Sequence, residues 1–358
     1  MSFFGSIMGG PQSFLGVDLG TASIKIAEIR KNGEQIRLEN YGILESLDYL
    51  ERFNEVIQAS SMKLSETHAA TYLKILLNRV GVRSKTVVAS IPAFNVFSTL
   101  VEAPHMSLSE TKNFIELQAK QYVPMPLSEV AFDWVKVGER VGKDGGSTQQ
   151  LLLISIPKEH VEKYQKLFKV VGLELKEIEL EGMALARSLT TGVNEVSLVV
   201  DIGSRSTSLA IAEGGFLKFS GQTDFSGGSL TQSIASGLGI SQRRAEDLKR
   251  QRGLMGFGGT RELSTLIEPM LDVILNEAKR VVGSFESSYQ SKVQAIILAG
   301  GGANLLGIEE YVSRVMGLPV KKGNPFRGIG YSPSIEPLLK DTGPLLSVAI
   351  GLGIKGYL

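Results

Sequence analysis

The sequence contains no cysteine among its 358 residues, so it can form no disulfide, no thiolate metal site and no cysteine nucleophile. It has only three histidines, His68, His105 and His160, which lie far apart and form no paired-ligand motif. It also has almost no net charge, because 38 Lys and Arg residues balance 37 Asp and Glu residues. A protein that binds nucleic acid through its phosphates needs a basic excess, so no nucleic-acid partner is expected.

Long uncharged hydrophobic runs are missing as well. No stretch approaches the ~20 apolar residues that a membrane-spanning helix needs. The first twelve residues lack the basic start and the long apolar core of a secretory signal, so we expect a cytoplasmic protein. Residues 1–12 are expected to form an N-terminal arm. Its apolar side chains (Phe3, Phe4, Ile7 and Met8) leave two alternatives open, a disordered terminus or a weak anchor or partner contact.

Glycine, by contrast, is abundant at 40 residues, and it is central to a pattern that occurs twice. Residues 15–27 read LGVDLGTASIKIA, and residues 198–210 read LVVDIGSRSTSLA. In both segments an apolar run reaches an aspartate, a glycine follows two residues later, and hydroxyl residues lead into an alternating apolar run. This pattern predicts two β-hairpins, one in each half of the chain.

The hairpin turns carry the residue types that bind phosphate with a metal ion. Gly20 and Gly203 have no side chain, so phosphate oxygens can approach the backbone closely. Exposed N–H groups and hydroxyls at such turns donate to anionic oxygens. The hydroxyl residues are Thr21, Ser23, Ser204 and Ser206. Asp18 and Asp201 would repel phosphate unless a cation lay between them, so the pair suggests a hydrated Mg²⁺ ion.

A third segment resembles a nucleotide platform. Residues 293–299 form an apolar strand of the buried type, Gly300, Gly301 and Gly302 follow it, and residues 305–316 have the apolar spacing of a helix. A strand, a triple-glycine turn and a helix start provide a place where a nucleotide can lie against the backbone. An ordinary tight turn is the alternative, and the two hairpins favour the nucleotide site.

These three segments resemble the phosphate-1, phosphate-2 and adenosine motifs of the actin, sugar kinase and heat-shock chaperone ATPase superfamily. Within it the chain is similar to the PilM family, the FtsA-related actin-like proteins of the type IV pilus inner-membrane platform, from about residue 14 to the C-terminus. The most specific stretches are QYVPMPLSEV at 121–130, GGSLTQ at 227–232, AEDLKR at 245–250 and AGGGANL at 299–305. The Tyr-Val-Pro-Met-Pro-Leu run is the part that indicates this family rather than the superfamily.

The resemblance implies an α/β protein with the actin-like ATPase fold, built from two RNase H-like lobes and an FtsA/PilM-type inserted subdomain. Proline and glycine punctuation sets the expected boundaries. Lobe I comprises residues 13–84 with 177–193 and 345–358. The inserted subdomain comprises residues 85–176, the core of lobe II comprises residues 194–225 with 293–344, and subdomain 2B comprises residues 226–292.

The expected cofactor is ATP with Mg²⁺, and the metal would be held through waters by Asp18 and Asp201. The expected cofactor-binding residues are Asp18, Gly20, Thr21, Lys25, Asp201, Gly203, Ser204, Gly227, Gly228, Glu246, Lys249, Gly300, Gly301, Gly302 and Asn304. For Lys25, a solvated lysine on an edge strand is an equal alternative to a phosphate contact. For Glu246 and Lys249, which share one helix face, a solvated ion pair is the alternative to ribose and adenine contacts.

Catalysis is the least defined expectation. By resemblance, Glu181 is the candidate for orienting a water molecule toward the γ-phosphate, and a helix-capping role is the alternative. We expect ATP binding with slow hydrolysis or none. A small-molecule kinase of the same fold, acting on a sugar-type substrate, is the competing function.

The resemblance also implies a partner. PilM-like proteins bind the short N-terminal cytoplasmic tail of the bitopic membrane protein PilN, and a groove of the inserted subdomain would receive it. The proline-rich corner at 123–127, together with Phe94, Val96 and Phe97, supplies candidate contacts. The expected location is the cytoplasm, with peripheral attachment to the inner membrane through this partner. Self-association is left open, because actin relatives polymerise but no feature of this sequence addresses it.

Overall fold

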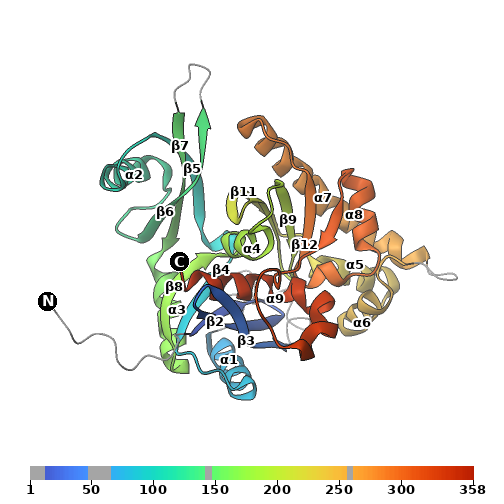
Figure 1. The fold of residues 1–358 in the computed structure, drawn as a ribbon. Coiled ribbons are helices and arrows are strands. Elements are labelled where there is room, and N and C mark those ends of the chain that lie inside the picture. The colour runs from blue at the N-terminus through green and yellow to red at the C-terminus, as the bar shows by residue number, and fades with distance from the viewer. Residues whose placement is uncertain (1–12, 47–65, 142–146, 256–260) are drawn as a thin grey trace.

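The computed structural model of the chain describes residues 13–46, 66–141, 147–255 and 261–358 (Figure 1). The expected N-terminal arm, residues 1–12, lies outside this range. Two lobes stand side by side, and a smaller module is attached to the first of them (Figure 1). Within the described residues, every helix is too short or too polar to cross a bilayer.

The first lobe is built on a five-stranded sheet. In spatial order its strands are β3 (Gln35–Glu45), β2 (Ser23–Asn32), β1 (Ser13–Leu19), β4 (Thr86–Ile91) and β8 (Glu174–Leu180). The first three strands are antiparallel, and β4 and β8 continue the sheet in parallel with β1. Helices α1 (Glu66–Val80) and α3 (Lys158–Val171) pack on one face through Leu73, Leu167 and Phe168.

The other face of this sheet is covered by the C-terminal helix α9 (Leu339–Lys355). The helix lies very close to the strands because the facing residues are glycines. A side chain at Gly16 on β1 would collide with the carbonyl oxygen of Ala349, and one at Gly353 would collide with Ile29 on β2. The helix begins six residues before the expected Leu345, with Pro344 inside it, so the expected limit at residue 344 falls within a helix of the first lobe.

The second lobe repeats the same sheet. In spatial order its strands are β11 (Phe216–Thr223), β10 (Thr207–Glu213), β9 (Ser197–Ile202), β12 (Ala295–Ala299) and β13 (Val320–Lys322). Its outer helices are α5 (Gly227–Leu238), α6 (Gln242–Arg252), α7 (Arg261–Tyr289) and α8 (Ile308–Met316). Helix α4 (Glu181–Thr190) packs between the two lobes, against α9 and against β10 and β11.

The two sheets confirm the repeat seen in the sequence. In each, a hairpin with an aspartate at the end of its first strand is followed by a parallel strand on the other side of that first strand. The register pairs Asp18 with Lys25 in one hairpin and Asp201 with Ser208 in the other. The α/β architecture with two related lobes therefore agrees with the expected fold class.

The inserted module is a three-stranded antiparallel sheet with one helix. Its strands are β5 (Phe97–Pro104), β7 (Ser147–Pro157) and β6 (Val130–Val141), in that spatial order, and its helix is α2 (Leu108–Tyr122). Ser107 and Glu110 form the capping box that starts α2. Helix α2 covers one face of the sheet and buries Val101, Ile115 and Leu153.

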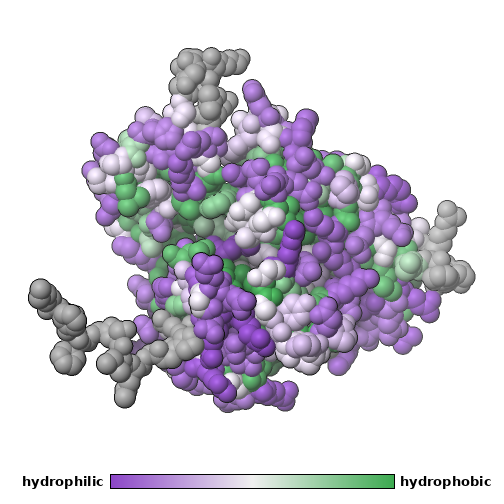
Figure 2. All heavy atoms as spheres, viewed as in Figure 1, coloured by the Kyte–Doolittle hydropathy of each residue, from purple (hydrophilic) through white to green (hydrophobic). Residues whose placement is uncertain are grey.

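The opposite face of this small sheet is turned toward the lobes and is only partly covered. Val96, Leu100, Val135 and Ile154 lie there half-buried, at the margin of a core that includes α4. Apolar side chains accordingly gather at the surface between the module and the lobes (Figure 2). The lobe-facing side of the three-stranded sheet therefore remains partly exposed in the described structure.

The expected limits of the inserted subdomain, 85–176, are too wide. Strand β4 pairs with β1, β8 pairs with β4, and α3 packs into the core of the first lobe, so all three belong to that lobe. The module proper runs from β5 to β7. The chain leaves the first sheet after Ile91, directly before Pro92, and rejoins the first lobe at Lys158, where α3 begins. The expected limits at 85 and 176 instead fall at the start of β4 and within β8, which are strands of the first sheet.

Candidate functional site

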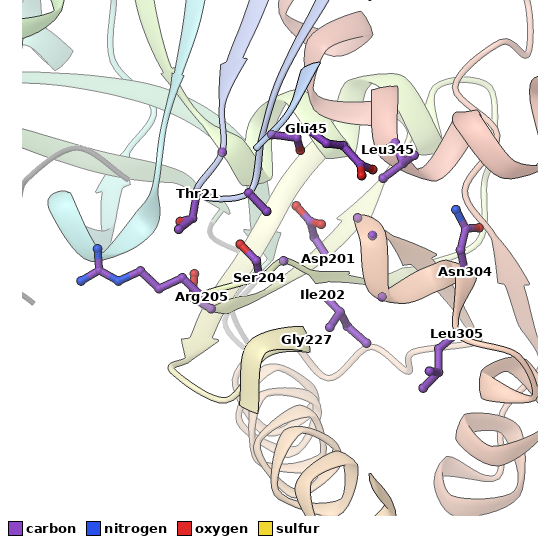
Figure 3. Close-up of a pocket in the computed structure, with 18 of the residues that line it drawn as sticks. Thr21, Glu45, Asp201, Ile202, Ser204, Arg205, Gly227, Asn304, Leu305 and Leu345 are labelled. Carbon is purple, nitrogen blue, oxygen red and sulfur yellow. The ribbon is translucent and has the colours of Figure 1, made fainter. Parts of the chain in front are cut away.

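A cavity of about 310 Å³ lies between the two lobes, where the two hairpins face each other (Figure 3). Each hairpin contributes its aspartate, its glycine and the hydroxyl residues that follow. The remaining walls come from the start of α5, one face of α6, the triple-glycine turn, Glu181 and Leu345. Of the sixteen residues expected at the site, fifteen line this cavity. Gly228 does not, because its N–H group is turned to the carbonyl of Ser204.

The first hairpin holds its aspartate in a fixed position. Asp18 is 4% exposed, and its two carboxylate oxygens accept hydrogen bonds from Lys25 Nζ at 2.9 Å and from Ser90 Oγ at 2.9 Å. Lys25 lies on β2, an interior strand, and its side chain is 13% exposed. The alternative of a solvated lysine on an edge strand is therefore wrong, because the ammonium is partly buried in an ion pair that lines the cavity.

The turn of this hairpin leaves one polar group unsatisfied. Thr21 is 4% exposed, and within the described residues its hydroxyl oxygen has no hydrogen-bond partner. A buried hydroxyl without a partner costs about 1–3 kcal/mol, so this one is expected to gain a partner such as a water molecule, an ion or a ligand. Gly20 permits the tight turn before it, since a Cβ there would lie 2.6 Å from the Ser23 carbonyl oxygen. The turn is thus shaped to present donors to an anion.

The second hairpin is fastened to the N-terminus of α5. Ser226 Oγ donates to the Ser204 carbonyl at 2.9 Å, and the Gly227 N–H donates to the Gly203 carbonyl at 2.8 Å. Gly227 permits this close packing, because a Cβ there would lie 3.1 Å from the Gly203 carbonyl oxygen. Gly203 is needed within the hairpin turn itself, where a Cβ would lie 2.9 Å from the Ser206 carbonyl oxygen. The positive end of the α5 dipole consequently lies beside the turn, where it favours a negatively charged ligand.

Helix α6 contributes a buried ionic network rather than a solvated pair. Lys249 Nζ lies 2.6 Å from Glu246 Oε2, and it also donates to Thr231 Oγ1 at 2.7 Å and to the Gly227 carbonyl at 2.9 Å. Glu246 is 5% exposed. With its three donors engaged, the ammonium of Lys249 is held in place, and its stem is the part that can lie along a base.

Glu246 is stabilised in its charged form. Burial by itself would raise the pKa of Glu246, but the charge of Lys249 and the hydrogen bonds from Arg250, Lys249 and Thr231 outweigh it. The pKa therefore lies below the ordinary value of 4.5. Its Oε1 atom accepts one hydrogen bond, from Arg250 Nε at 2.8 Å, so this oxygen keeps capacity for a further donor such as a hydroxyl.

The triple-glycine turn approaches the second aspartate. Strand β12 pairs in parallel with β9, which places Ala299 beside Asp201. Gly300 then adopts φ 73° and ψ −176°, a conformation that only glycine takes readily. A side chain there would collide with Asp201 Oδ1 and would lie 2.6 Å from the Ile202 carbonyl oxygen. The turn can therefore pack closely against the second hairpin because it has no side chains there.

Asn304 lines the cavity, but its amide is engaged elsewhere. Its Nδ2 donates to the Asp341 carbonyl at 2.8 Å, and its Oδ1 accepts from Lys322 Nζ at 3.1 Å. These contacts fasten the triple-glycine turn to the start of α9 and to β13. The expected contact of Asn304 with a nucleotide can thus come from its backbone, while its side chain supports the turn.

Glu181 begins helix α4 and is 4% exposed on the cavity wall. Its carboxylate lies in the first turn, where the helix dipole stabilises a negative charge. This position is compatible both with stabilising the helix and with holding a water molecule in the cavity. Its catalytic role stays a prediction.

The sequence motifs did not reveal several residues that line the cavity. Glu45 and Leu345 belong to no recognised motif, and Arg205 and Arg250 lie within recognised stretches but were given no role; the four reach the site from β3, α9, the second hairpin and α6. Arg250 had a usable signal, because it is four residues after Glu246 and so shares its helix face. Figure 3 shows Arg205 extending away from the cavity floor, beside Ser204.

The carboxylates in the cavity suit a metal ion whose other ligands are water molecules and phosphate oxygens. Across the described ranges, no group of three or more histidine, cysteine, aspartate or glutamate side chains is close enough to hold a metal alone. Mg²⁺ binds through one or two carboxylates and substrate phosphates, with several waters retained. Asp18 and Asp201, one from each hairpin, match that requirement and not that of a metal held by protein ligands only.

Comparison with known families and structures gives a consistent picture. The family described as "Type IV pilus assembly protein PilM" matches residues 16–357. Among curated proteins, the cell division protein FtsA of Pseudomonas aeruginosa is 27% identical over 219 residues, which cover 54% of this chain and 51% of that protein. The chain thus spans about half the length of that relative. FtsA of Enterococcus hirae is 21% identical, with 86% of this chain and 77% of that protein covered.

Solved structures show the same fold. A structure titled "PilM-PilN type IV pilus biogenesis complex" has a TM-score of 0.80 and 23% identity, with 98% of this chain and 100% of that chain covered. MreB5 of Spiroplasma citri, solved bound to ADP, has a TM-score of 0.54 and 15% identity, with 97% and 96% covered. At these identities the likeness establishes the architecture, an actin-like α/β fold.

Proposed function

Because the chain belongs to the PilM family of type IV pilus assembly proteins, we propose that it binds one Mg²⁺–ATP between its lobes and acts as a nucleotide-dependent adaptor. Its partner would be the cytoplasmic N-terminal tail of a PilN-type inner-membrane protein. The protein would then be cytoplasmic and attached to the membrane through that tail. The observation that carries the nucleotide part is the cavity, into which two equivalent hairpins from two equivalent sheets project.

The phosphates would lie between the two turns. Thr21 and Ser204 are positioned to donate backbone or hydroxyl hydrogens, and Lys25 supplies a positive charge beside Asp18. Gly203, whose N–H donates to the Ser206 carbonyl, would contribute by letting phosphate oxygens approach the backbone. Asp18 and Asp201 would hold the metal through waters. When bound, Mg²⁺ neutralises phosphate charge that two carboxylates would otherwise repel.

The nucleoside would lie toward α6 and the triple-glycine turn. The Oε1 atom of Glu246 can accept a ribose hydroxyl, and the stem of Lys249 together with the backbone of Gly301 and Gly302 can border a base. MreB5 of Spiroplasma citri, which shares this fold, was solved with ADP, and this supports a nucleotide as the ligand.

The partner part of the proposal rests on the half-covered face of the inserted module. Its apolar residues face the lobes and stay partly exposed, which suits an extended apolar peptide. The solved PilM–PilN complex shares the fold and supports a PilN-type tail as the occupant. The groove would be lined by Ala93, Val96, Leu100, Val135, Ile154 and Met183.

The proline-rich corner contributes less to this groove than expected. Val123 is buried and Leu127 is partly buried in the module's own core, on the side of α2, and Met125 is 38% exposed. Strand alternation places Phe97 on the face opposite Leu100, whereas Val96 lies at the groove. The side chain of Phe94 lies outside the described residues. Of the residues expected to contact the tail, Val96 therefore remains a candidate contact in the proposed groove.

Replacing Thr21 by valine tests the phosphate site. Because the hydroxyl has no partner in the described structure, removing it should leave the thermal stability of the nucleotide-free protein unchanged or slightly higher. The same change should weaken Mg²⁺–ATP binding about tenfold, since a hydrogen bond to a charged group contributes about 1.5 kcal/mol or more. Calorimetric titration and a thermal melt measure the two effects.

Thr190 supplies the matched control for this substitution. Its buried hydroxyl donates to the Ala186 carbonyl at 2.7 Å and accepts from the Gly215 N–H at 3.0 Å. Thr190→Val should therefore lower the free energy of unfolding by about 1–3 kcal/mol and leave ATP affinity unchanged. If Thr21→Val destabilised the protein as Thr190→Val does, without weakening ATP binding, Thr21 would have a structural role only.

A further inference from the structure

An ion pair crosses the mouth of the cavity from one lobe to the other. Arg250 Nη1, on α6 of the second lobe, lies 3.0 Å from Glu45 Oε2, at the end of β3 in the first lobe. Both residues line the cavity, and Figure 3 shows Glu45 at its edge, across from Asp201. Their side chains are 49% and 45% exposed, so water reaches the pair from outside.

Each end of this pair is fastened to a different part of the proposed nucleotide site. Glu45 pairs with Ser23 across β2 and β3, and the next residue donates its N–H to the Ala22 carbonyl, so Glu45 moves with the first phosphate turn. Arg250 donates through Nε to Glu246 at 2.8 Å, on the nucleoside side. The guanidinium therefore connects the phosphate turn of one lobe with the nucleoside wall of the other.

The chemistry of the pair suits a contact that opens and re-forms. A guanidinium is planar and presents several donors, so one Arg250 can hold Glu246 and Glu45 at once, which an ammonium cannot do with the same geometry. Burial would lower the pKa of Arg250, but the two carboxylates outweigh it and raise the pKa, so the side chain stays charged. The bond to Glu246 lies within one helix, whereas the bond to Glu45 must break when the lobes separate.

We propose that Glu45 and Arg250 are positioning residues that hold the lobes closed over bound nucleotide and limit the rate at which it leaves. This inference rests on the proposed function, because it requires a nucleotide in the cavity. Opening the lobes exposes the ligand and costs this ion pair, so the pair slows release more than it affects the contacts to the phosphates.

The test uses the full chain loaded with Mg²⁺ and ATP that is radiolabelled on the α-phosphate, followed by a chase with unlabelled ATP. Glu45→Gln removes the charge across the cleft and keeps the Arg250–Glu246 bond. It should speed release about two- to fivefold at low salt, the range that a partly exposed ion pair allows. Added salt screens the Arg250–Glu45 ion pair, so it should speed nucleotide release from the unaltered protein until that rate equals the rate of Glu45→Gln.

A second variant and a control define the outcome. Arg250→Lys keeps the positive charge but loses the planar guanidinium that contacts Glu246 and Glu45 at once, and it should also speed the release of nucleotide. Glu195→Gln removes a comparably exposed ion pair, with Lys321, away from the cavity, and should change nothing. Equal release from the unaltered protein and from Glu45→Gln at low salt would overturn the inference and leave ATP binding intact. Failure of the unaltered protein to retain ATP would instead contradict the proposed function.

Discussion

Gly300→Ala is expected to weaken ATP binding at least tenfold. The residue has φ 73° and ψ −176°, a region in which a side chain costs about 1–3 kcal/mol. The new methyl group would also meet Asp201 Oδ1 and the Ile202 carbonyl. To relieve these contacts, the triple-glycine turn and the second hairpin must move apart, and both line the proposed nucleotide site. Calorimetric titration with Mg²⁺–ATP measures the loss.

The cost of adding a side chain at a positive φ can be measured away from the site. Gly317 ends α8 in the left-handed region, with φ 69° and ψ 20°, and among the described residues no atom lies within 4 Å of a Cβ placed there. Gly317→Ala should therefore cost about 1 kcal/mol of stability and leave ATP affinity unchanged. Unchanged ATP affinity in Gly300→Ala, in a protein as stable as the control, would show that this turn does not contact nucleotide.

Leu100→Asp is expected to abolish binding of the PilN-type tail. Leu100 lies on the edge strand β5 and is half-buried at the apolar face that is turned toward the lobes. A peptide that covers it would bury most of the side chain, which contributes about 2 kcal/mol, and a carboxylate there would have to lose its water. The affinity for a synthetic tail peptide should fall at least about thirtyfold. Fluorescence anisotropy with the labelled peptide measures it.

The same substitution at Leu117 serves as the control. Leu117 is on α2, in the same module, but it is 65% exposed and lies away from the groove. Leu117→Asp should leave both the fold and the peptide affinity as they are, because an exposed leucine already contacts water. Normal peptide binding by Leu100→Asp, or its loss in Leu117→Asp alone, would place the tail elsewhere on the molecule. ATP binding should be unaffected in both variants.

The parts of the fold that the sequence predicted are local. Each hairpin is encoded within about fifteen residues, by alternation around a glycine turn, and both hairpins form as predicted. The start of α2 is also determined locally, since Ser107 and Glu110 form a capping box within four residues. In these cases the information that determines the structure lies next to it in the chain.

The predictions from sequence were wrong or incomplete where the structure depends on contacts between residues far apart in the chain. Strands β4 and β8 are separated by the whole inserted module, and nothing near Thr86 or Glu174 indicates that they pair in the first sheet. The ionic network of α6 is similar: Glu246 and Lys249 have the spacing of an ordinary surface pair, and only the packing of α5 over them buries the pair. The contact of Arg250 with Glu45 depends on how the lobes meet, which no local pattern encodes.

The central claim is that two aspartates from opposite lobes hold one metal-bound ATP. Calorimetric titration of ATP into the full chain, with Mg²⁺ and again with EDTA, tests it in the unaltered protein and in Asp18→Asn and Asp201→Asn. The account predicts one site, binding at least tenfold weaker in EDTA, and variants that in Mg²⁺ bind no better than the unaltered protein does without metal. Full affinity in both variants, or no dependence on metal, would contradict it.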